Sequence, residues 1–495
     1  MIVDRSSLFE FDDLSSERLE LDAFLEERKR VLASYETGQE VDLEEAIEYL
    51  SALPDHKNAA KRFETAVAAD DLVLQPRAAV ALIDQHIDLL TYLQDEGDAD
   101  ILPTQVDSYS RDLEFERAAD GLEESREKGE SVLNGFPFVI HGVEGTRRVT
   151  EVVDRPLCMR QVTPDIRLVT EVALAGGYTG VTSHAIDGVI SFSKDYNLAK
   201  AIKHYQYVDR LAAYYTDHDV PIYREYRGMV DAVHLPPSLI IASSILEALM
   251  GAEQGVKTMA VCSYVSGHLT QEAAGLRVLR QLAEEYLGRL GYDDVTVFAN
   301  ANHWLGQYPQ DEATAYQLIN MGTVAAVLGE ANELIVKTVE EGKGIPTKEG
   351  NADSLRSTRA VIDTVEPQKD LLLDEDAMER EMAMIESAAR AILDKTLALG
   401  DGDPAIGTVK AFESGVLDSL LAPWRGLRND IMIVRDGTGA MRYLDHGNLP
   451  LPEEVVNYHR TRIDERAERE GREPSYEMLV DDVEAPAEGG LLRGD

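Results

Sequence analysis

The hydrophobic positions of this chain fall into two kinds of segment. From residue 15 to about residue 70, apolar residues such as Leu21, Phe24 and Leu25 recur at helical spacing among Glu, Arg and Lys. Beyond this segment, short apolar runs that end in Gly, Asn, Arg, Ser or His alternate with longer amphipathic helical patterns. The first segment predicts a helical N-terminal extension, and the second predicts alternating strands and helices.

The short apolar runs predict about eight strands. We expect them at residues 72–75, 101–102, 136–140, 157–159, 222–223, 258–262, 295–298 and 333–336. Alternation at this spacing indicates parallel βαβ units with right-handed crossovers, and about eight such units favour a (β/α)₈ TIM-type barrel. The alternative is an open doubly wound sheet, which is less favoured because no Gly-x-Gly-x-x-Gly follows the first strand and no P-loop pattern occurs.

The end of the chain has a different pattern. A long helical pattern covers residues 376–399, and a turn-rich segment at 400–404 separates it from a mixed tail. We therefore expect three parts. They are a helical N-terminal extension (1–70), the barrel (71–370) and a C-terminal helical and mixed α+β region that packs on the barrel (371–495).

Composition narrows the classes of function. Acidic residues number 91 against 48 basic residues, and a net charge of −43 argues against binding to nucleic acid or an anionic membrane. The two cysteines, Cys158 and Cys262, lie in apolar runs and are expected to be buried thiols. The 11 histidines are scattered, with no His-Glu-x-x-His or Cys-x-x-Cys, so no metal site is expected. No secretion signal or membrane span is visible, and we expect a cytoplasmic protein.

Arginines stand at the ends of three predicted strands. Arg77 ends the first, Arg111 follows the second, and Arg160 ends the fourth. In barrels of this type the carboxyl ends of the strands carry the active site, and a guanidinium group offers a planar fork to a carboxylate or phosphate. The alternative is that each arginine pairs with one of the many acidic side chains at the surface. The polar loops at 309–312, 336–338 and 345–349 also follow strands, or serve as helix starts.

Several stretches carry a family resemblance. They are residues 75–78 (QPRA), 92–97 (YLQDEG), 133–137 (LNGFP), 163–165 (TPD), 236–238 (PPS), 252–257 (AEQGVK), 309–312 (PQDE), 344–349 (GIPTKE) and 406–415 (IGTVKAFESG). From about residue 40 to its end, the chain resembles the large (epsilon) subunit of glutamate mutase, also called methylaspartate mutase.

The resemblance implies radical chemistry at the barrel mouth. It implies adenosylcobalamin held mainly by a separate small subunit, whose radical removes a hydrogen atom so that glutamate and 3-methylaspartate interconvert. It further implies two large subunits within a heterotetramer. Subunits that ligate cobalt carry Asp-x-His-x-x-Gly, and the nearest match here, Asp84-Gln85-His86, has Leu89 in place of the glycine. This chain is therefore not expected to ligate cobalt.

The resemblance also assigns site residues. Arg77, Arg111 and Arg160 match the arginines that bind the substrate carboxylates. The positions that match cofactor contacts are Ala79, Asn134, Ser191, Tyr308, Lys337, Glu341 and Ile345.

Part of the substrate wall departs from the family pattern. Gln161 stands in place of a histidine, and Thr182, Gly188 and Phe192 stand in place of a glutamate and two tyrosines. The segment 223–228 reads Tyr-Arg-Glu-Tyr-Arg-Gly where the family has Asn-Arg-Glu-Pro-Phe-Gly. Loss of that glutamate removes the partner of the substrate's ammonium group, a hydrogen bond of about 1.5 to 3 kcal/mol.

Three hypotheses follow. The first is a glutamate-mutase-type catalytic subunit, and the second is the same radical chemistry on a different dicarboxylate or amino acid. The third is a catalytically silent barrel that binds a partner subunit or a metabolite. His184, Asp187, Arg227 and His303 either shape the pocket of such a barrel or serve as packing and surface residues.

Overall fold

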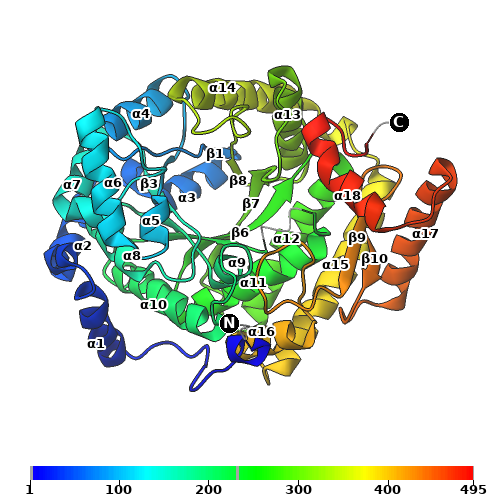
Figure 1. Cartoon of the computed structure of the whole chain (residues 1–495), viewed down its shortest axis with the longest axis horizontal. Helices are drawn as coiled ribbons and strands as arrows, with labels where there is room; N and C mark the ends of the chain where they lie inside the picture. Colours follow the sequence, from blue (N-terminus) through cyan, green and yellow to red (C-terminus); the bar gives the residue numbers. More distant parts are fainter. Residues whose placement is uncertain (1–3, 230–233, 494–495) are drawn as a thin grey trace.

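The computed structural model describes residues 4–229 and 234–493, and in these residues eight parallel strands form a ring surrounded by helices (Figure 1). The strands are β1 (Val73–Gln75), β2 (Leu102–Gln105), β3 (Leu157–Arg160), β4 (Gly180–Thr182), β5 (Tyr223–Arg227), β6 (Thr258–Val265), β7 (Thr296–His303) and β8 (Glu333–Ile335). They pair in the order β1-β8-β7-β6-β5-β4-β3-β2. The predicted TIM-type barrel is confirmed.

The strand prediction contains one wrong strand and omits one strand. Residues 136–140 are not a strand, because Phe136 makes a single bridge to Val106 and helix α7 begins at Phe138. A short buried apolar run fits a strand or a buried helix equally well, and here the helix forms. Strand β4 was not predicted, since Gly180 and Thr182 leave it with a single aliphatic residue. Arg160 therefore ends the third strand and not the fourth.

Between β1 and β2 the barrel is closed by a few backbone hydrogen bonds and by the side chain of Asp100. The Asp100 N–H donates to the Leu74 carbonyl oxygen at 3.0 Å, and the Leu74 N–H donates to the Asp100 carboxylate at 2.8 Å. Arg62 and Arg359 bind the same carboxylate at 2.7 and 3.1 Å. The Asp100 carboxylate thus supplements the sparse backbone hydrogen bonds between the first two strands.

The N-terminal elements cover one end and one side of the barrel. They are η1 (Arg5–Leu8), α1 (Leu21–Leu32), η2 (Glu36–Glu40), α2 (Leu43–Ser51), η3 (Asp55–Lys57) and α3 (Ala59–Ala69). Phe63 of α3 lies at the amino-terminal end of the barrel strands and stacks on Tyr223 and Phe298, with ring centroids 4.3 and 5.0 Å apart. This apolar plug fills the amino-terminal end of the barrel in the described residues and leaves the carboxyl end of the strands for a site.

Helices connect the strands around the outside. They are α4 (Ile83–Asp95), α5 (Ser108–Arg111), α6 (Phe115–Lys128), α7 (Phe138–Val152), α8 (Arg167–Ala175), α9 (Ala185–Ile190), α10 (Leu198–Thr216), α11 (Pro237–Gln254), α12 (Leu269–Arg289), α13 (Glu312–Leu328) and α14 (Lys348–Val365). His86, from the incomplete cobalt motif, lies on α4 and is buried, with Nε2 2.9 Å from Thr104 Oγ1. Cys158 and Cys262 are buried free thiols.

The C-terminal elements pack against the outside of α11 and α12 (Figure 1). They are η4 (Glu366–Leu371), α15 (Glu375–Leu399), α16 (Pro404–Ser414), β9 (Ile431–Arg435), β10 (Met441–His446), α17 (Glu453–Glu470), α18 (Tyr476–Glu484) and η5 (Ala485–Glu488). The helix predicted at 376–399 is confirmed. The division of the chain at residues 70 and 370 stays a prediction.

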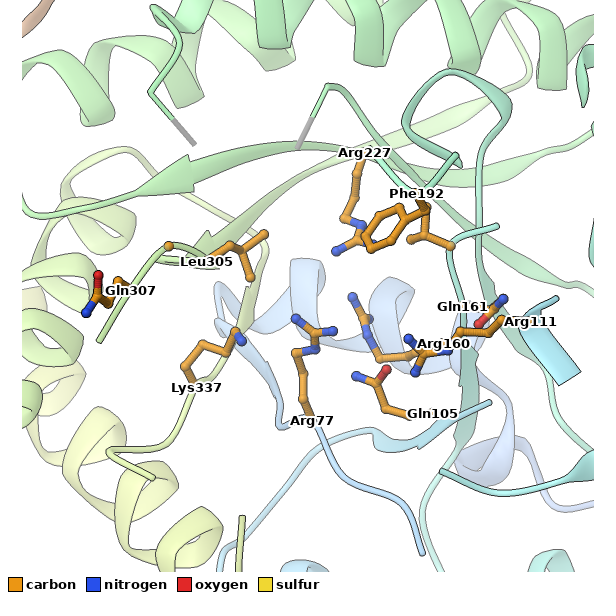
Figure 2. Close-up of a pocket in the computed structure, with 12 residues that line it drawn as sticks. Arg77, Gln105, Arg111, Arg160, Gln161, Phe192, Arg227, Leu305, Gln307 and Lys337 are labelled. Atoms are coloured by element: carbon orange, nitrogen blue, oxygen red, sulfur yellow. The ribbon is translucent and has the colours of Figure 1, made fainter. Parts of the chain in front are cut away.

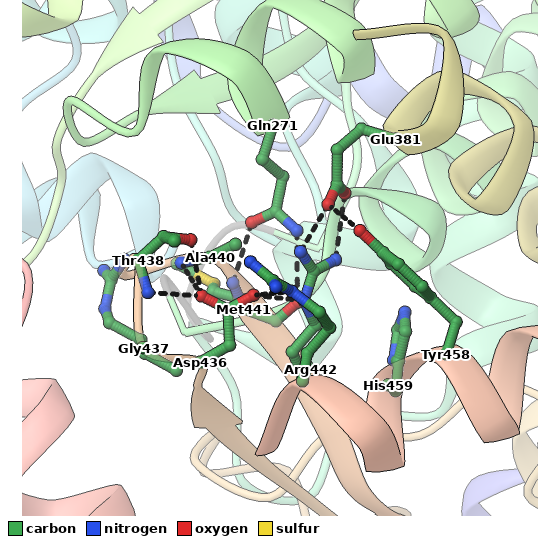
Figure 3. A network of polar contacts seen from close by, with 12 residues as sticks. Gln271, Glu381, Asp436, Gly437, Thr438, Ala440, Met441, Arg442, Tyr458 and His459 are labelled. Atoms are coloured by element: carbon green, nitrogen blue, oxygen red, sulfur yellow. Dashed lines mark hydrogen bonds and ion pairs between the residues drawn. The ribbon is translucent and has the colours of Figure 1, made fainter. Parts of the chain in front are cut away.

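A buried polar network joins this region to the barrel helices (Figure 3). Gln271 of α12 exchanges two hydrogen bonds with the backbone of Met441, at 2.8 and 3.1 Å. Arg442 binds Glu381 of α15 on one side and Asp436 on the other, with N···O distances of 2.9 Å to each.

In the described part of the chain, no helix is both long and apolar enough to cross a membrane.

Candidate active site

A cavity of about 510 Å³ lies at the carboxyl ends of the barrel strands. We call it the arginine cavity. It is lined by Arg77, Gln105, Arg111, Arg160, Gln161, Val162, Phe192, Arg227, Leu305, Gly306, Gln307 and Lys337. Gln105, Arg160 and Arg227 are the last residues of β2, β3 and β5. These polar residues therefore lie where barrels of this type carry their active sites, at the carboxyl ends of the strands. Figure 2 shows Arg77, Arg227 and Lys337 pointing into this space from different sides.

Arg160 forms the floor of the cavity and is already neutralised within the chain. Its two terminal nitrogens donate to the two oxygens of Glu225 at 2.6 and 2.9 Å, and one of them also donates to Gln75 at 2.9 Å. Burial alone would raise the pKa of Glu225, but the Arg160 guanidinium outweighs it and holds that pKa below its usual range. Glu225 is therefore an anion at neutral pH and pairs with Arg160.

Thr182 belongs to the same buried row. The strand register places Arg160 beside Thr182 and Thr182 beside Glu225. The Thr182 hydroxyl donates to Glu225 at 2.8 Å. Thr182 thus contacts the Arg160–Glu225 pair and is not among the residues that line the cavity.

The other two altered positions lie on the loop and helix after β4. Gly188 is buried in α9, where a Cβ atom would lie 2.7 Å from the Thr163 carbonyl oxygen, so a larger residue would require this segment to move. Phe192 lines the cavity and is 49 % exposed. Of Thr182, Gly188 and Phe192, only Phe192 reaches the arginine cavity.

Arg77 is held at the cavity wall by Gln105. With its amide oxygen turned toward Arg77, Gln105 accepts from Nε at 2.7 Å and from a terminal nitrogen at 3.1 Å. The pKa of Arg77 is lowered to about 10, mainly by burial; Glu341 opposes the shift, and the neighbouring Arg227, Arg160 and Arg111 add to it. A buried guanidinium group with other cations beside it favours a bound anion, because the anion offsets both the burial and the repulsion.

Arg111 and Gln161 complete the side of the cavity nearest β2 and β3. Arg111 ends α5 and its Nε donates to the Val106 carbonyl at 2.9 Å, which fixes the direction of its guanidinium. Gln161 is 4 % exposed, and neither its amide oxygen nor its amide nitrogen has a hydrogen-bond partner in the described residues. A buried amide without partners costs free energy unless a ligand satisfies it.

A second cavity of about 430 Å³ adjoins the first. We call it the side cavity. It is lined by Arg77, Ala78, Ala79, Leu89, Gln105, Arg111, Asn134, Glu341, Gly344, Ile345 and Pro346. Arg77, Gln105 and Arg111 line both cavities. The structure therefore brings together four residues predicted to contact the cofactor (Ala79, Asn134, Glu341 and Ile345) and places them next to the arginines.

The remaining cofactor predictions lie in different places. Lys337 lines the arginine cavity and donates to Glu341 at 2.6 Å. Burial lowers the pKa of Lys337 to about 8, although Glu341 opposes this shift. Tyr308 is buried next to the loop that carries Glu341, and its hydroxyl has no partner in the described residues. Ser191 lines neither cavity and donates to Asp187.

Four residues were expected either to shape the pocket or to serve in packing or at the surface, and the structure places one of them in the cavity wall and three outside it. Arg227 lines the cavity. His184 and Asp187 are buried and form a 3.0 Å pair. His303 is buried, with Nε2 3.1 Å from Thr323, and its Nδ1 accepts from the Lys337 N–H at 3.2 Å. His303 therefore positions the backbone of Lys337 without reaching the cavity.

Two residues of this site were missed in the sequence. Gln105 ends β2 and could have been found by searching the ends of the predicted strands for amide side chains as well as for arginines. Glu225 is a carboxylate in the middle of a barrel strand, a position where a charged group must be paired. In the described residues, no cluster of three or more His, Cys, Asp or Glu could hold a metal ion.

Comparison with known proteins gives a consistent result. A family model described as the methylaspartate mutase E chain matches residues 53–494. The proteins named glutamate mutase epsilon subunit include one from Desulfitobacterium hafniense, 42 % identical over 97 % of this chain and 99 % of the relative. Others are from Haloarcula marismortui (42 % identical, covering 93 % and 92 %) and Escherichia coli O157:H7 (39 % identical, covering 97 % and 99 %).

Proposed function

This chain belongs to the methylaspartate mutase E chain family, and we propose that it is the catalytic large subunit of an adenosylcobalamin-dependent carbon-skeleton mutase. Its substrate would be a small dicarboxylate or amino acid related to glutamate. The observation that carries the proposal is the wall shared by the two cavities. Arg77, Gln105 and Arg111 line both, so a substrate in one cavity and a cofactor group in the other would be immediate neighbours.

The substrate side of this wall is built for carboxylates. Arg77 and Arg111 present guanidinium groups whose directions are fixed by Gln105 and by the Val106 carbonyl. A charged fork held in place binds a carboxylate with charge-assisted hydrogen bonds and loses little freedom on binding. Gln161 would supply an amide donor and acceptor to the same ligand.

The side cavity fits part of a nucleoside-bearing cofactor. Asn134 and Glu341 offer an amide and a carboxylate, the kinds of group that bind ribose hydroxyls, and Ile345 supplies apolar surface that is 53 % exposed. When bound, adenosylcobalamin would supply the carbon radical that removes a hydrogen atom from the substrate. The chain's own contribution would be to hold the substrate on Arg77 and Arg111 next to that group and to exclude water.

A partner subunit would complete the site. The rim of the two cavities carries exposed apolar side chains, Phe192 on one and Ile345 on the other. Exposed apolar groups at a functional opening are typical of a surface that another protein covers. We propose a small cobalamin-binding subunit as that protein, with two copies of the present chain in a heterotetramer as the resemblance implies.

The test is electron paramagnetic resonance on the reconstituted enzyme. The purified chain is mixed with a cobalamin-binding small subunit from a relative, adenosylcobalamin and a panel of small dicarboxylates, glutamate among them. At least one acid should produce a radical signal, and Arg111→Gln should abolish that signal while subunit association persists. An assembled complex that gives no signal with any acid of the panel would refute the mutase function and favour a silent barrel.

A further inference from the structure

The charged residues that line the arginine cavity are all cationic in the described part of the chain. Five of its lining residues are cationic (Arg77, Arg111, Arg160, Arg227 and Lys337), and among the described residues no carboxylate lines it. Each positive charge that lacks a partner within the chain must be balanced by a ligand or by solvent. The cations that lack a hydrogen-bonded carboxylate within the chain are therefore the ones available to a ligand.

Two of the five cations are balanced by the chain itself. Arg160 is bound through both terminal nitrogens to Glu225, and Lys337 is bound to Glu341 at 2.6 Å. In the part of the chain that the structure describes, no carboxylate lies within 4.0 Å of the guanidinium groups of Arg77 or Arg111. Glu341 acts on Arg77, and Asp107 and Asp112 act on Arg111, only from beyond that distance, so both guanidinium groups are available to a ligand.

Arg227 is the third cation of the cavity without a hydrogen-bonded carboxylate in the described residues. Strand β5 alternates, so Tyr223, Glu225 and Arg227 face the barrel interior while Arg224 faces outward and binds Asp209. Arg227 is 4 % exposed and its Nε has no hydrogen-bond partner in the described residues.

The acid nearest to Arg227 gives it little compensation. Asp187 Oδ2 lies 3.9 Å from a terminal nitrogen of Arg227, and the same oxygen lies 3.0 Å from Nε2 of His184. At 3.9 Å there is no hydrogen bond, in contrast to the 2.6 Å contact between Arg160 and Glu225. Figure 2 shows the guanidinium of Arg227 directed toward the space above Arg160 and Arg77.

We propose that the substrate is a small tricarboxylate without an ammonium group, and that Arg227 binds the carboxylate that stands where an amino acid would carry its nitrogen. Arg77 and Arg111 bind the other two carboxylates, and the buried amide of Gln161 bonds one of their oxygens. The assignment of this ligand as a substrate rests on the proposed mutase function.

An ammonium group would meet an unfavourable surface here. Glu225 beneath the cavity and Glu341 beside it are already engaged by Arg160 and Lys337. An ammonium would have to approach Arg227 or Arg77 without a free carboxylate, and like charges placed together in an interface oppose binding. The same crowding becomes favourable when a third carboxylate takes the ammonium's place.

The test is calorimetric binding to the purified full-length chain at pH 7 and constant ionic strength. The probes are propane-1,2,3-tricarboxylate, glutarate and L-glutamate. The tricarboxylate should bind about tenfold more tightly than glutarate, and glutarate about tenfold more tightly than glutamate. Arg227→Gln should remove the advantage of the tricarboxylate and leave glutarate binding within about threefold. Arg227→Lys keeps the charge and should retain most of that advantage.

Controls separate charge selectivity from folding and from the mutase function. Arg460→Gln, at an exposed pair with Asp464 on α17, should leave all three affinities unchanged, and circular dichroism checks that each variant folds. Glutamate binding as tight as glutarate, an unchanged ratio in Arg227→Gln, or no tricarboxylate binding at millimolar concentration would each overturn the inference. If the inference fails but glutamate gives a radical signal, the proposed mutase function still holds. If the chain selects the tricarboxylate but no acid gives a radical signal, only the proposed mutase function is refuted.

Discussion

Two sets of buried arginines in this molecule differ in what neutralises them. In the C-terminal region, Arg442 lies between Glu381 and Asp436 and over the ring of Tyr458, 4.9 Å from its centroid (Figure 3). At the barrel mouth, Arg77 and Arg227 have other cations as neighbours (Figure 2). The first arrangement is complete within the chain, and the second is not.

The difference separates a structural role from a binding role. An arginine with two carboxylates holds helices and strands together, and removing it leaves buried anions without a partner. Crowded guanidinium groups repel one another and stabilise nothing by themselves, so their presence is explained by a ligand that they bind. Arg160 combines both, because it lines the cavity but is paired with Glu225.

The largest effect on stability is expected at the fully paired arginine. Arg442→Met should lower the free energy of unfolding by about 3 to 5 kcal/mol, since Glu381 and Asp436 would stay buried without their principal cation. Urea denaturation at pH 7 measures this, and acid binding at the mouth should not change. The surface variant Arg460→Gln should shift stability by less than about 0.5 kcal/mol. A loss below about 1 kcal/mol for Arg442→Met would contradict the structural role.

Much of the fold could be predicted from the sequence, because a strand followed by an amphipathic helix repeats along most of it. The two errors lie in short segments, where the pattern of apolar and polar residues does not distinguish a strand from a helix or a loop. The run at 136–140 is apolar enough for a strand but begins a helix, and β4 (Gly180–Thr182) is too short to show a pattern.

The site was predictable as far as it depends on strand ends. Arg77, Arg111 and Arg160 do lie at one mouth. The pairing of Arg160 with Glu225 was not predicted, because it depends on the register that β4 sets between β3 and β5. Without β4, no sequence pattern could show that Thr182 lies between these two residues.

An effect of the opposite kind is expected at the barrel mouth. Arg77→Gln should weaken binding of the tightest acid in the calorimetric panel by about 2 to 4 kcal/mol, because one carboxylate loses its charged fork in a buried site. The free energy of unfolding should stay the same or rise, since the variant relieves repulsion among Arg77, Arg111, Arg160 and Arg227. Calorimetry and urea denaturation on the same preparation measure both. If Arg77→Gln lost as much stability as Arg442→Met and kept its affinity for the acid, Arg77 would have a structural role like that of Arg442 and not a binding role.

The smallest effect is a pH dependence at Lys337, the one cation of the cavity that can lose its charge near neutral pH. Burial lowers its pKa to about 8, while Arg77 and Arg227 add repulsion and Glu341 opposes the shift. Burial alone would raise the pKa of Glu341, but Lys337 and Arg77 hold it below its usual range, so Glu341 stays anionic throughout.

As pH rises through about 8, Lys337 becomes neutral and its pair with Glu341 changes from zero to one negative charge. Affinity for a polycarboxylate should therefore fall between pH 7 and 9, by up to about tenfold for the loss of one nearby charge. Arg77, with a pKa of about 10, should contribute only above this range. Lys337→Arg should remove the decline, because a guanidinium paired with Glu341 keeps its proton to much higher pH. Calorimetric titrations at pH 7, 8 and 9 at constant ionic strength measure the decline, and an equal decline in both proteins would assign it to another group.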